Sequence, residues 1–90
     1  MAKRGKLEII RDILFIIQEN RNSIKKTPLI RKSNLSTGRF NEYYSDLMRK
    51  RFVIEIVNNK SGKVVSLSEK GRKFLEKYQV IVSFIDEFNL

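Results

Sequence analysis

Residues with small or polar side chains recur at a spacing that would place them along one side of a helix: Thr37, Gly38, Asn41 and Ser45. The amide of Asn41 can form paired hydrogen bonds with an adenine in the DNA major groove, and Gly38 would let the backbone approach a base closely. A solvated face is the ordinary alternative for such a pattern. These positions are therefore candidate base-facing residues, and the elements around them decide between the two interpretations.

Side chains that can bind phosphate oxygens surround this segment. Basic groups and hydroxyls fix the position of a protein on DNA through such contacts without reading the sequence. The candidates are Lys26, Thr27, Arg31, Lys32, Ser36, Arg39, Lys60 and Lys63. Glu42 also falls on the wet face of the expected helix, where it either accepts a hydrogen bond from a cytosine amino group or repels the DNA backbone.

The composition restricts the kind of partner. The 90 residues contain 19 Lys and Arg against 10 Asp and Glu, a formal net charge of +9, and the pI is about 10.1. This balance favours polyanions, with nucleic acid as the first candidate, an anionic membrane surface as the second and mere solubility as the third. The absence of Cys and His excludes a disulfide framework, a thiolate zinc site and the commonest catalytic base. The sequence predicts neither an enzyme nor a metal or small-molecule cofactor.

The charge is unevenly distributed along the chain. Residues 69–90 carry four basic and four acidic groups, so the whole excess lies in residues 1–68. This division predicts a polyanion-binding front and a protein-binding end. The basic start, residues 1–6, is expected to be a mobile arm that precedes an amphipathic helix over 7–20, not a signal peptide or a membrane span. We therefore expect an intracellular protein, cytoplasmic and associated with the nucleoid.

A helix-turn-helix is expected over residues 27–51. Thr27 is a suitable N-cap and Pro28 a suitable first helical residue, while Ser36 would cap the second helix. In that second helix, apolar residues recur at intervals of four and three and form a stripe for burial: Phe40, Tyr44 and Leu47. The candidate base-facing residues would then lie on the exposed side.

A β-hairpin is expected over residues 52–67. Two runs dense in β-branched residues, 52–57 and 64–67, flank a polar segment that contains Gly62. The candidate phosphate contacts Lys60 and Lys63 lie at the tip of this hairpin. Ile24, a lone apolar residue, is expected to pair briefly with it.

The last helix, expected over residues 68–90 with Ser68 as its N-cap, carries a second apolar pattern. These residues step by four, three, four and three, the seam spacing of helices that pair side by side: Phe74, Tyr78, Ile81, Ile85 and Phe88. A helix of roughly 20 residues spans about 30 Å, longer than so small a body needs. We therefore expect its far end to meet a second copy and form a homodimer.

Several strings occur in an order that resembles one group of proteins. They are Leu7-Glu8-Ile9-Ile10 with Asp12-Ile13-Leu14, Lys26-Thr27, Asn34-Leu35-Ser36, Tyr44 with Leu47, and Leu67-Ser68-Glu69-Lys70-Gly71 with Phe74-Leu75. The order resembles the archaeal winged helix-turn-helix DNA-binding proteins, which include the 10a chromatin proteins and the ArnR-type regulators. The resemblance implies a single α+β, mostly α domain over residues 1–90, with three helices, a two-stranded wing and a long C-terminal helix. It also implies double-stranded DNA binding, dimers joined through the last helix and no catalysis.

The chain departs from that group in several places. Pro28 stands where such proteins often have a basic residue, and Arg51 stands where a glycine usually ends the recognition helix. The end of that helix is therefore expected to be built differently or strained. The hairpin tip is longer than in many relatives, and the last helix is shorter than in the 10a proteins.

A protein-interaction module is the main alternative. Winged helices also serve as accessory subunits of transcription or replication assemblies, and here the hairpin with Tyr43 and Phe52 would bind a protein. Plain core packing of Tyr43 and Phe52 is the favoured alternative for these two residues. Such a module should bind free DNA weakly and without sequence preference, unlike a regulator or a chromatin protein. An enzyme is the weaker alternative, because no nucleophile and base pair is available without His or Cys.

Overall fold

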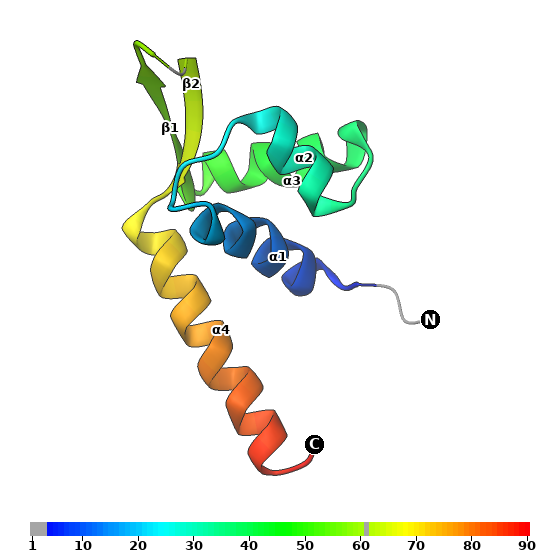
Figure 1. Ribbon diagram of the computed structural model, residues 1–90. Coiled ribbons are helices and arrows are strands. Elements are labelled where there is room, and N and C mark those ends of the chain that lie inside the picture. The colour runs from blue at the N-terminus through cyan, green and yellow to red at the C-terminus, as the bar shows by residue number, and fades with distance from the viewer. Residues whose placement is uncertain (1–3, 61) are drawn as a thin grey trace.

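The computed structural model describes residues 4–60 and 62–90 (Figure 1). In chain order the elements are α1 (Lys6–Glu19), α2 (Lys26–Ser33), α3 (Thr37–Arg49), β1 (Val53–Asn58), β2 (Gly62–Leu67) and α4 (Glu69–Glu87). The two strands pair antiparallel. The predicted α+β, mostly α fold with a two-stranded wing and a long last helix is confirmed.

Helix α1 is the centre of the core, because it contacts α2, β2 and the start of α4. Its buried residues recur at intervals of three and four on a wide apolar face: Ile9, Ile10, Ile13, Leu14 and Ile17. Each such side chain contributes about 1.5–3 kcal/mol when it is removed from water. The same core takes in Leu29 of α2, Phe40 and Leu47 of α3, Val65 of β2 and Leu75 of α4.

The start of the chain is tied to the folded body. Residues 1–3 of the predicted basic arm lie outside the described residues. The Arg4 guanidinium donates to the Asp12 carboxylate at 3.0 Å and to the Ser33 carbonyl oxygen at 3.1 Å. Gly5 is the N-cap of α1 and Lys6 is its first residue. Residues 4–6 thus belong to the folded body rather than to an arm, because the Asp12 carboxylate on α1 and the Ser33 carbonyl at the end of α2 both bind Arg4.

Helix α2 begins two residues earlier than predicted. Thr27 and Pro28 lie inside the helix, and the N-cap is Lys25, which is extended and makes no side-chain cap. The Leu29 N–H donates to the Lys25 carbonyl oxygen at 3.1 Å, which is the first backbone bond of the helix. Pro28 is tolerated because the first N–H groups of a helix have no partner within it. The predicted Thr27 cap is therefore wrong.

Helix α3 begins and is buried as predicted. The Ser36 hydroxyl accepts a hydrogen bond from the Arg39 N–H at 3.2 Å. Phe40, Tyr44 and Leu47 are its buried residues. The period of this stripe therefore sets which face of α3 remains exposed.

The end of α3 is strained, as expected from the missing glycine. Arg51 has a φ of 62°, in the left-handed region. Its N–H donates to the Met48 carbonyl oxygen at 3.1 Å, and the Phe52 N–H donates to the Leu47 carbonyl oxygen at 2.9 Å. This pair of bonds is a Schellman motif, in which glycine is the usual residue because side chains are unfavourable there.

The hairpin is anchored to the segment that follows α1. Val53 pairs with Leu67 and Asn58 with Gly62 at the two ends of the ladder. Ile24 forms an isolated bridge with Val65, through backbone bonds of 3.1 and 2.7 Å, so its predicted pairing is confirmed. These bonds add a third backbone segment beside β2 and leave β1 as the outer strand.

Helix α4 starts against the end of α3. Ser68 caps it as predicted, accepting from the Gly71 N–H at 3.1 Å. The same hydroxyl lies 2.6 Å from the Arg51 carbonyl oxygen and 3.0 Å from that of Phe52. The Lys70 ammonium donates to the Lys50 carbonyl oxygen at 2.9 Å. The two helices therefore meet through backbone carbonyls, and α4 then leaves the body on the side away from the hairpin (Figure 1).

Candidate nucleic-acid interface

The outer face of α3 presents most of the candidate base-facing residues to solvent. Thr37, Gly38 and Ser45 are exposed, together with Glu42. No atom within 4 Å would meet a Cβ added at Gly38, so the backbone there is open to a close approach. This part of α3 is therefore accessible to a large partner.

Asn41 is placed differently from the other candidates. It is half-buried, and its Oδ1 is covered while having no hydrogen-bond partner in the described part of the chain. Asn41 follows Phe40 by one residue, about 100° around the helix, so it lies at the border of the buried stripe. A paired contact with adenine uses both the oxygen and the nitrogen of the amide. The side chain must therefore rotate outward before it can form that contact.

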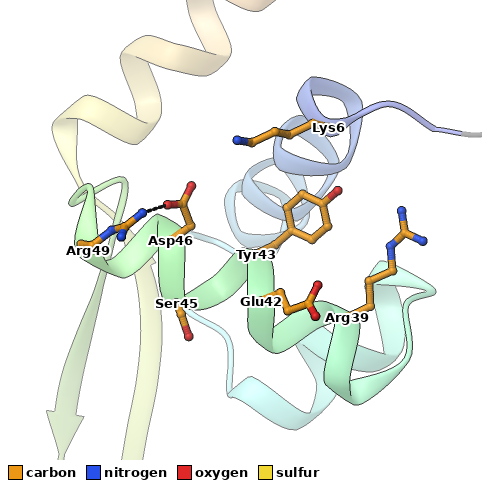
Figure 2. A pocket seen from close by; sticks show the side chains of 7 residues that line it. All are labelled: Lys6, Arg39, Glu42, Tyr43, Ser45, Asp46 and Arg49. Carbon is orange, nitrogen blue, oxygen red and sulfur yellow. Dashed lines mark hydrogen bonds and ion pairs between the residues drawn. The ribbon is translucent and has the colours of Figure 1, made fainter.

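A groove of about 590 Å³ runs between α3 and the beginning of α1 (Figure 2). Its lining residues are Lys6, Arg39, Glu42, Tyr43, Ser45, Asp46 and Arg49. Lys6 reaches across from α1 toward the side of α3 that carries Asp46. Sequence reasoning missed Lys6 as a contact because it assigned that residue to an arm. Its position three residues before the buried Ile9 was the signal that it could belong to the helix.

Asp46 neutralises part of the positive charge at the end of α3. Its carboxylate accepts from Arg49 and lies 3.3 Å from the Lys50 ammonium. The hydrogen bond from Arg49, followed by that from Lys50, holds the pKa of Asp46 below its ordinary value. Arg39 at the other end of α3 is exposed, and no ion pair of its side chain occurs among the described residues. Arg39 is therefore more available than Arg49 to bind a phosphate.

A polar cluster joins α2, α3 and the wing. The Tyr44 hydroxyl donates to Glu55 Oε2 at 2.6 Å, and Lys63 Nζ lies 3.6 Å from Glu55 Oε1. Lys26 Nζ lies 4.9 Å from the centre of the Tyr44 ring, within cation–π distance. We call these residues the Tyr44–Glu55 cluster: Lys26, Tyr44, Glu55 and Lys63. It brings two candidate phosphate contacts, from α2 and β2, to the same place.

The charges within this cluster shift the pKa of two groups. The hydrogen bond from Tyr44 lowers the pKa of Glu55, and the nearby Lys63 and Lys26 charges act in the same direction against the cost of burial. Burial, followed by the bond to Glu55, raises the pKa of Tyr44. Glu55 is therefore ionised and Tyr44 protonated at neutral pH.

The remaining candidate phosphate contacts are distributed over α2, the turn and the hairpin tip. Arg31, Lys32 and Lys60 are exposed. The Lys32 ammonium donates to Asn20 Oδ1 at 3.1 Å. The Ser36 hydroxyl oxygen accepts the cap bond of α3, while its proton can still be donated to a phosphate. Thr27 is exposed in the first turn of α2. These residues remain candidates.

The apolar seam predicted for α4 divides into an inner and an outer part. Phe74 packs against the core and makes an edge-to-face contact with Phe52 at 5.6 Å between ring centres. Tyr78 is half-buried and stacks on Phe74. Ile81, Ile85 and Phe88 are exposed by 58%, 39% and 58%, joined by Val80 and Phe84 at 67% and 54%. The far end of α4 thus presents an apolar surface that nothing in the described chain covers.

Two further features bear on other functions. Within residues 4–60 and 62–90, no group of three or more carboxylates is arranged to hold a metal ion. A search of the same residues found no helix with the length and apolar character that crossing a bilayer requires.

Known proteins with the same architecture place this chain in a family. The sequence matches the winged helix-turn-helix family over residues 3–85. Comparison with curated proteins found no significant match. Sso10a-2, a DNA-binding protein from Sulfolobus solfataricus, superposes with a TM-score of 0.73 at 19% identity, over 96% of this chain and 86% of that one. The PcaV transcriptional regulator from Streptomyces coelicolor superposes with a TM-score of 0.74 at 12% identity, over 89% of this chain and 60% of that one. The predicted resemblance is thus confirmed in its fold, and the chain belongs to the winged helix-turn-helix family.

Proposed function

We propose that this protein binds double-stranded DNA as a homodimer and acts as a transcription regulator or a chromatin protein. Helix α3 of each copy would enter the major groove at one half-site. The observation that carries the proposal is the exposed face of α3 with cations on both of its flanks. Lys6 and Arg39 border the groove beside Tyr43, and Lys26 and Lys63 lie around Tyr44.

Contacts to DNA would divide into two classes. Thr37, Gly38 and Ser45 would face base edges, and Asn41 would join them after its side chain rotates outward. Phosphates would be bound from the flanks of α3, from α2 and from the hairpin tip, which fixes the register of the protein on the duplex. We add Lys6 to the predicted phosphate contacts because it faces α3 across the groove of Figure 2.

The exposed end of α4 supports the homodimer. Ile81, Ile85 and Phe88 are exposed, whereas the residues of α4 that pack on the core, Phe74 and Leu75, lie near its start. Covering such side chains removes apolar surface from water at about 25 cal/mol per Å². Phe74 already packs inside its own chain, so the interface would consist of Tyr78 and the residues beyond it. The balanced charge of residues 69–90 also lets two such helices approach without strong repulsion.

The test is the salt dependence of duplex binding. If the dimer neutralises about six to ten phosphates, affinity should fall about 10³- to 10⁵-fold between about 50 and 200 mM salt. A mobility-shift titration over this range measures the slope. Arg39→Ala should weaken binding to all sequences alike, because a phosphate contact carries no sequence information. Binding that is indifferent to salt would exclude this mechanism.

A protein-interaction module is the second candidate, and the wing favours it. Ile54 and Ile56 share one face of β1 and are exposed by 43% and 44%. Exposed apolar side chains that lie together in this way are typical of protein contacts. Phe52, a candidate protein contact from the sequence, packs edge-to-face on Phe74 and against the core. It is therefore not part of the exposed surface of the wing. A module of this kind would bind free DNA weakly, so the same titration separates the two functions.

A further inference from the structure

Glu55 is an acidic residue inside an expected polyanion interface. It lies beside Lys63 and close to the Lys26 charge, in a chain of net charge +9. An ionised carboxylate at this place repels phosphate and by itself weakens DNA binding. Both of its oxygens are engaged within the protein, one by the Tyr44 hydroxyl at 2.6 Å and the other by Lys63 at 3.6 Å.

We propose that Glu55 and Tyr44 are positioning residues for a phosphate-binding site formed by Lys26 and Lys63. The inference rests on the proposed DNA binding and assigns a role within it to a tyrosine and a carboxylate that touch no DNA themselves. The ligand is a backbone phosphate of the duplex. The site draws on four elements, because these residues lie on α2, α3, β1 and β2.

The anchor of this arrangement is rigid. Tyr44 is 5% exposed, and its ring stacks on Phe40 with 5.4 Å between the ring centres. The hydroxyl therefore has a fixed position from which it holds Glu55. Glu55 in turn restrains Lys63, whose flexible side chain is 63% exposed and otherwise free to sample many rotamers. The face of the same Tyr44 ring restrains Lys26.

The Tyr44–Glu55 cluster restrains the side chains of Lys26 and Lys63 before DNA binds. A lysine that is ordered only when DNA arrives loses side-chain entropy at that moment, and the loss reduces affinity. A lysine that is already held near its binding position loses less. The competing interpretation is an ion pair that serves fold stability alone. The two interpretations predict opposite signs when the charge of Glu55 is removed.

The experiment measures the affinity of the full chain for a duplex of about 30 base pairs, long enough for two half-sites, by fluorescence anisotropy at several salt concentrations. Glu55→Gln keeps the shape and can still accept from Tyr44, but it no longer holds the Lys63 ammonium. We expect affinity about 3- to 10-fold weaker than wild type with the salt slope unchanged, because Lys63 still binds its phosphate but loses more side-chain entropy when it does so. Lys63→Ala removes the contact from both copies of the proposed dimer and should lower the salt slope by about 1.8. The double variant should bind like Lys63→Ala alone.

One control variant and one further test variant complete the experiment. Glu42→Gln removes an exposed carboxylate of α3 that makes no ion pair among the described residues, so it should tighten binding. Tyr44→Phe keeps the buried ring and releases Glu55, so it should weaken binding in the same direction as Glu55→Gln. Thermal unfolding of each variant shows whether it is folded at the temperature of the assay, which separates a loss of folded protein from weaker binding.

The outcomes are distinct. Wild type that binds duplex, together with Glu55→Gln that binds as tightly or more tightly, overturns this inference and leaves the proposed function intact. Wild type that fails to bind any duplex at low salt overturns both. Weaker binding by Glu55→Gln that persists in full in the Lys63→Ala background also contradicts the inference, because Glu55 would then act by another route.

Discussion

Replacing Gly71 with alanine tests the junction between α3 and α4. A Cβ at this position would lie 2.3 Å from the Phe52 carbonyl oxygen and 3.4 Å from a methyl group of Leu67, whereas real Cβ contacts stay above 3.0 Å. The start of α4 would therefore have to move by about 0.7 Å, which is the difference between the 2.3 Å approach to the Phe52 oxygen and the 3.0 Å minimum. Such a shift would stretch the Ser68 bonds to Phe52, which are already 3.0 and 3.1 Å long.

The magnitude follows from opposing effects. Overpacking against backbone costs about 1–3 kcal/mol, and weakened hydrogen bonds add about 1 kcal/mol. Alanine regains about 1 kcal/mol of helix propensity. The net loss is about 2 kcal/mol, or roughly 8–16 °C in Tm for a domain of this size.

The assay is thermal unfolding followed by circular dichroism, at one fixed protein concentration because the Tm of the proposed dimer would depend on it. Gly38→Ala is the matched control, since it is also helical and nothing lies within 4 Å of its Cβ. It should raise stability by up to about 1 kcal/mol. A Gly71→Ala protein with a Tm equal to or above that of wild type would refute the proposed packing of α4 on the end of α3.

Three other predictions follow from the structure. Arg51→Gly should stabilise the protein by about 0.5–1 kcal/mol in denaturant unfolding, because glycine adopts the φ of 62° without left-handed strain. The backbone entropy that glycine loses on folding offsets part of this gain. An unchanged denaturant midpoint would mean that the strain is absent. Ile85→Lys should give monomers in sedimentation velocity, since it places a charge in the proposed interface, and an unchanged sedimentation coefficient would place the interface elsewhere. The pKa of Glu55 is lowered from its ordinary value of 4.5, so the stabilisation by the ionised carboxylate is complete above that pH and is lost as the pH falls through the lower pKa of the folded state. Glu55→Gln should therefore lose less Tm than wild type on acidification from about pH 5 to pH 3. Equal losses of Tm would contradict the Glu55 interactions.

Local signals in the sequence predicted the elements well. Ser36 and Ser68 cap their helices, and the period of Phe40, Tyr44 and Leu47 identifies the buried side of α3. A cap and a stripe depend on residues within one turn of each other, so sequence spacing is sufficient to find them.

Contacts between distant residues could not be predicted in the same way. Arg4 binds the Ser33 carbonyl oxygen 29 positions away, and Tyr44 binds Glu55 across two elements. Both depend on how the elements pack. Asn41 was assigned to the exposed border of α3, but the covering of its Oδ1 depends on neighbours that a helical projection omits. The predicted start of α2 is two residues late because its N-cap, Lys25, makes no side-chain cap, so residue type gives no signal there.

The most direct test of DNA binding through α3 is an amide NMR titration with duplex DNA at low salt. The account predicts that the largest shifts occur at Thr37, Gly38 and Ser45 and near the hairpin tip at Lys63, while Val80 and Phe84 of α4 change little. Shifts concentrated on α4 or on the outer strand at Ile54 and Ile56, with α3 unchanged, would contradict it.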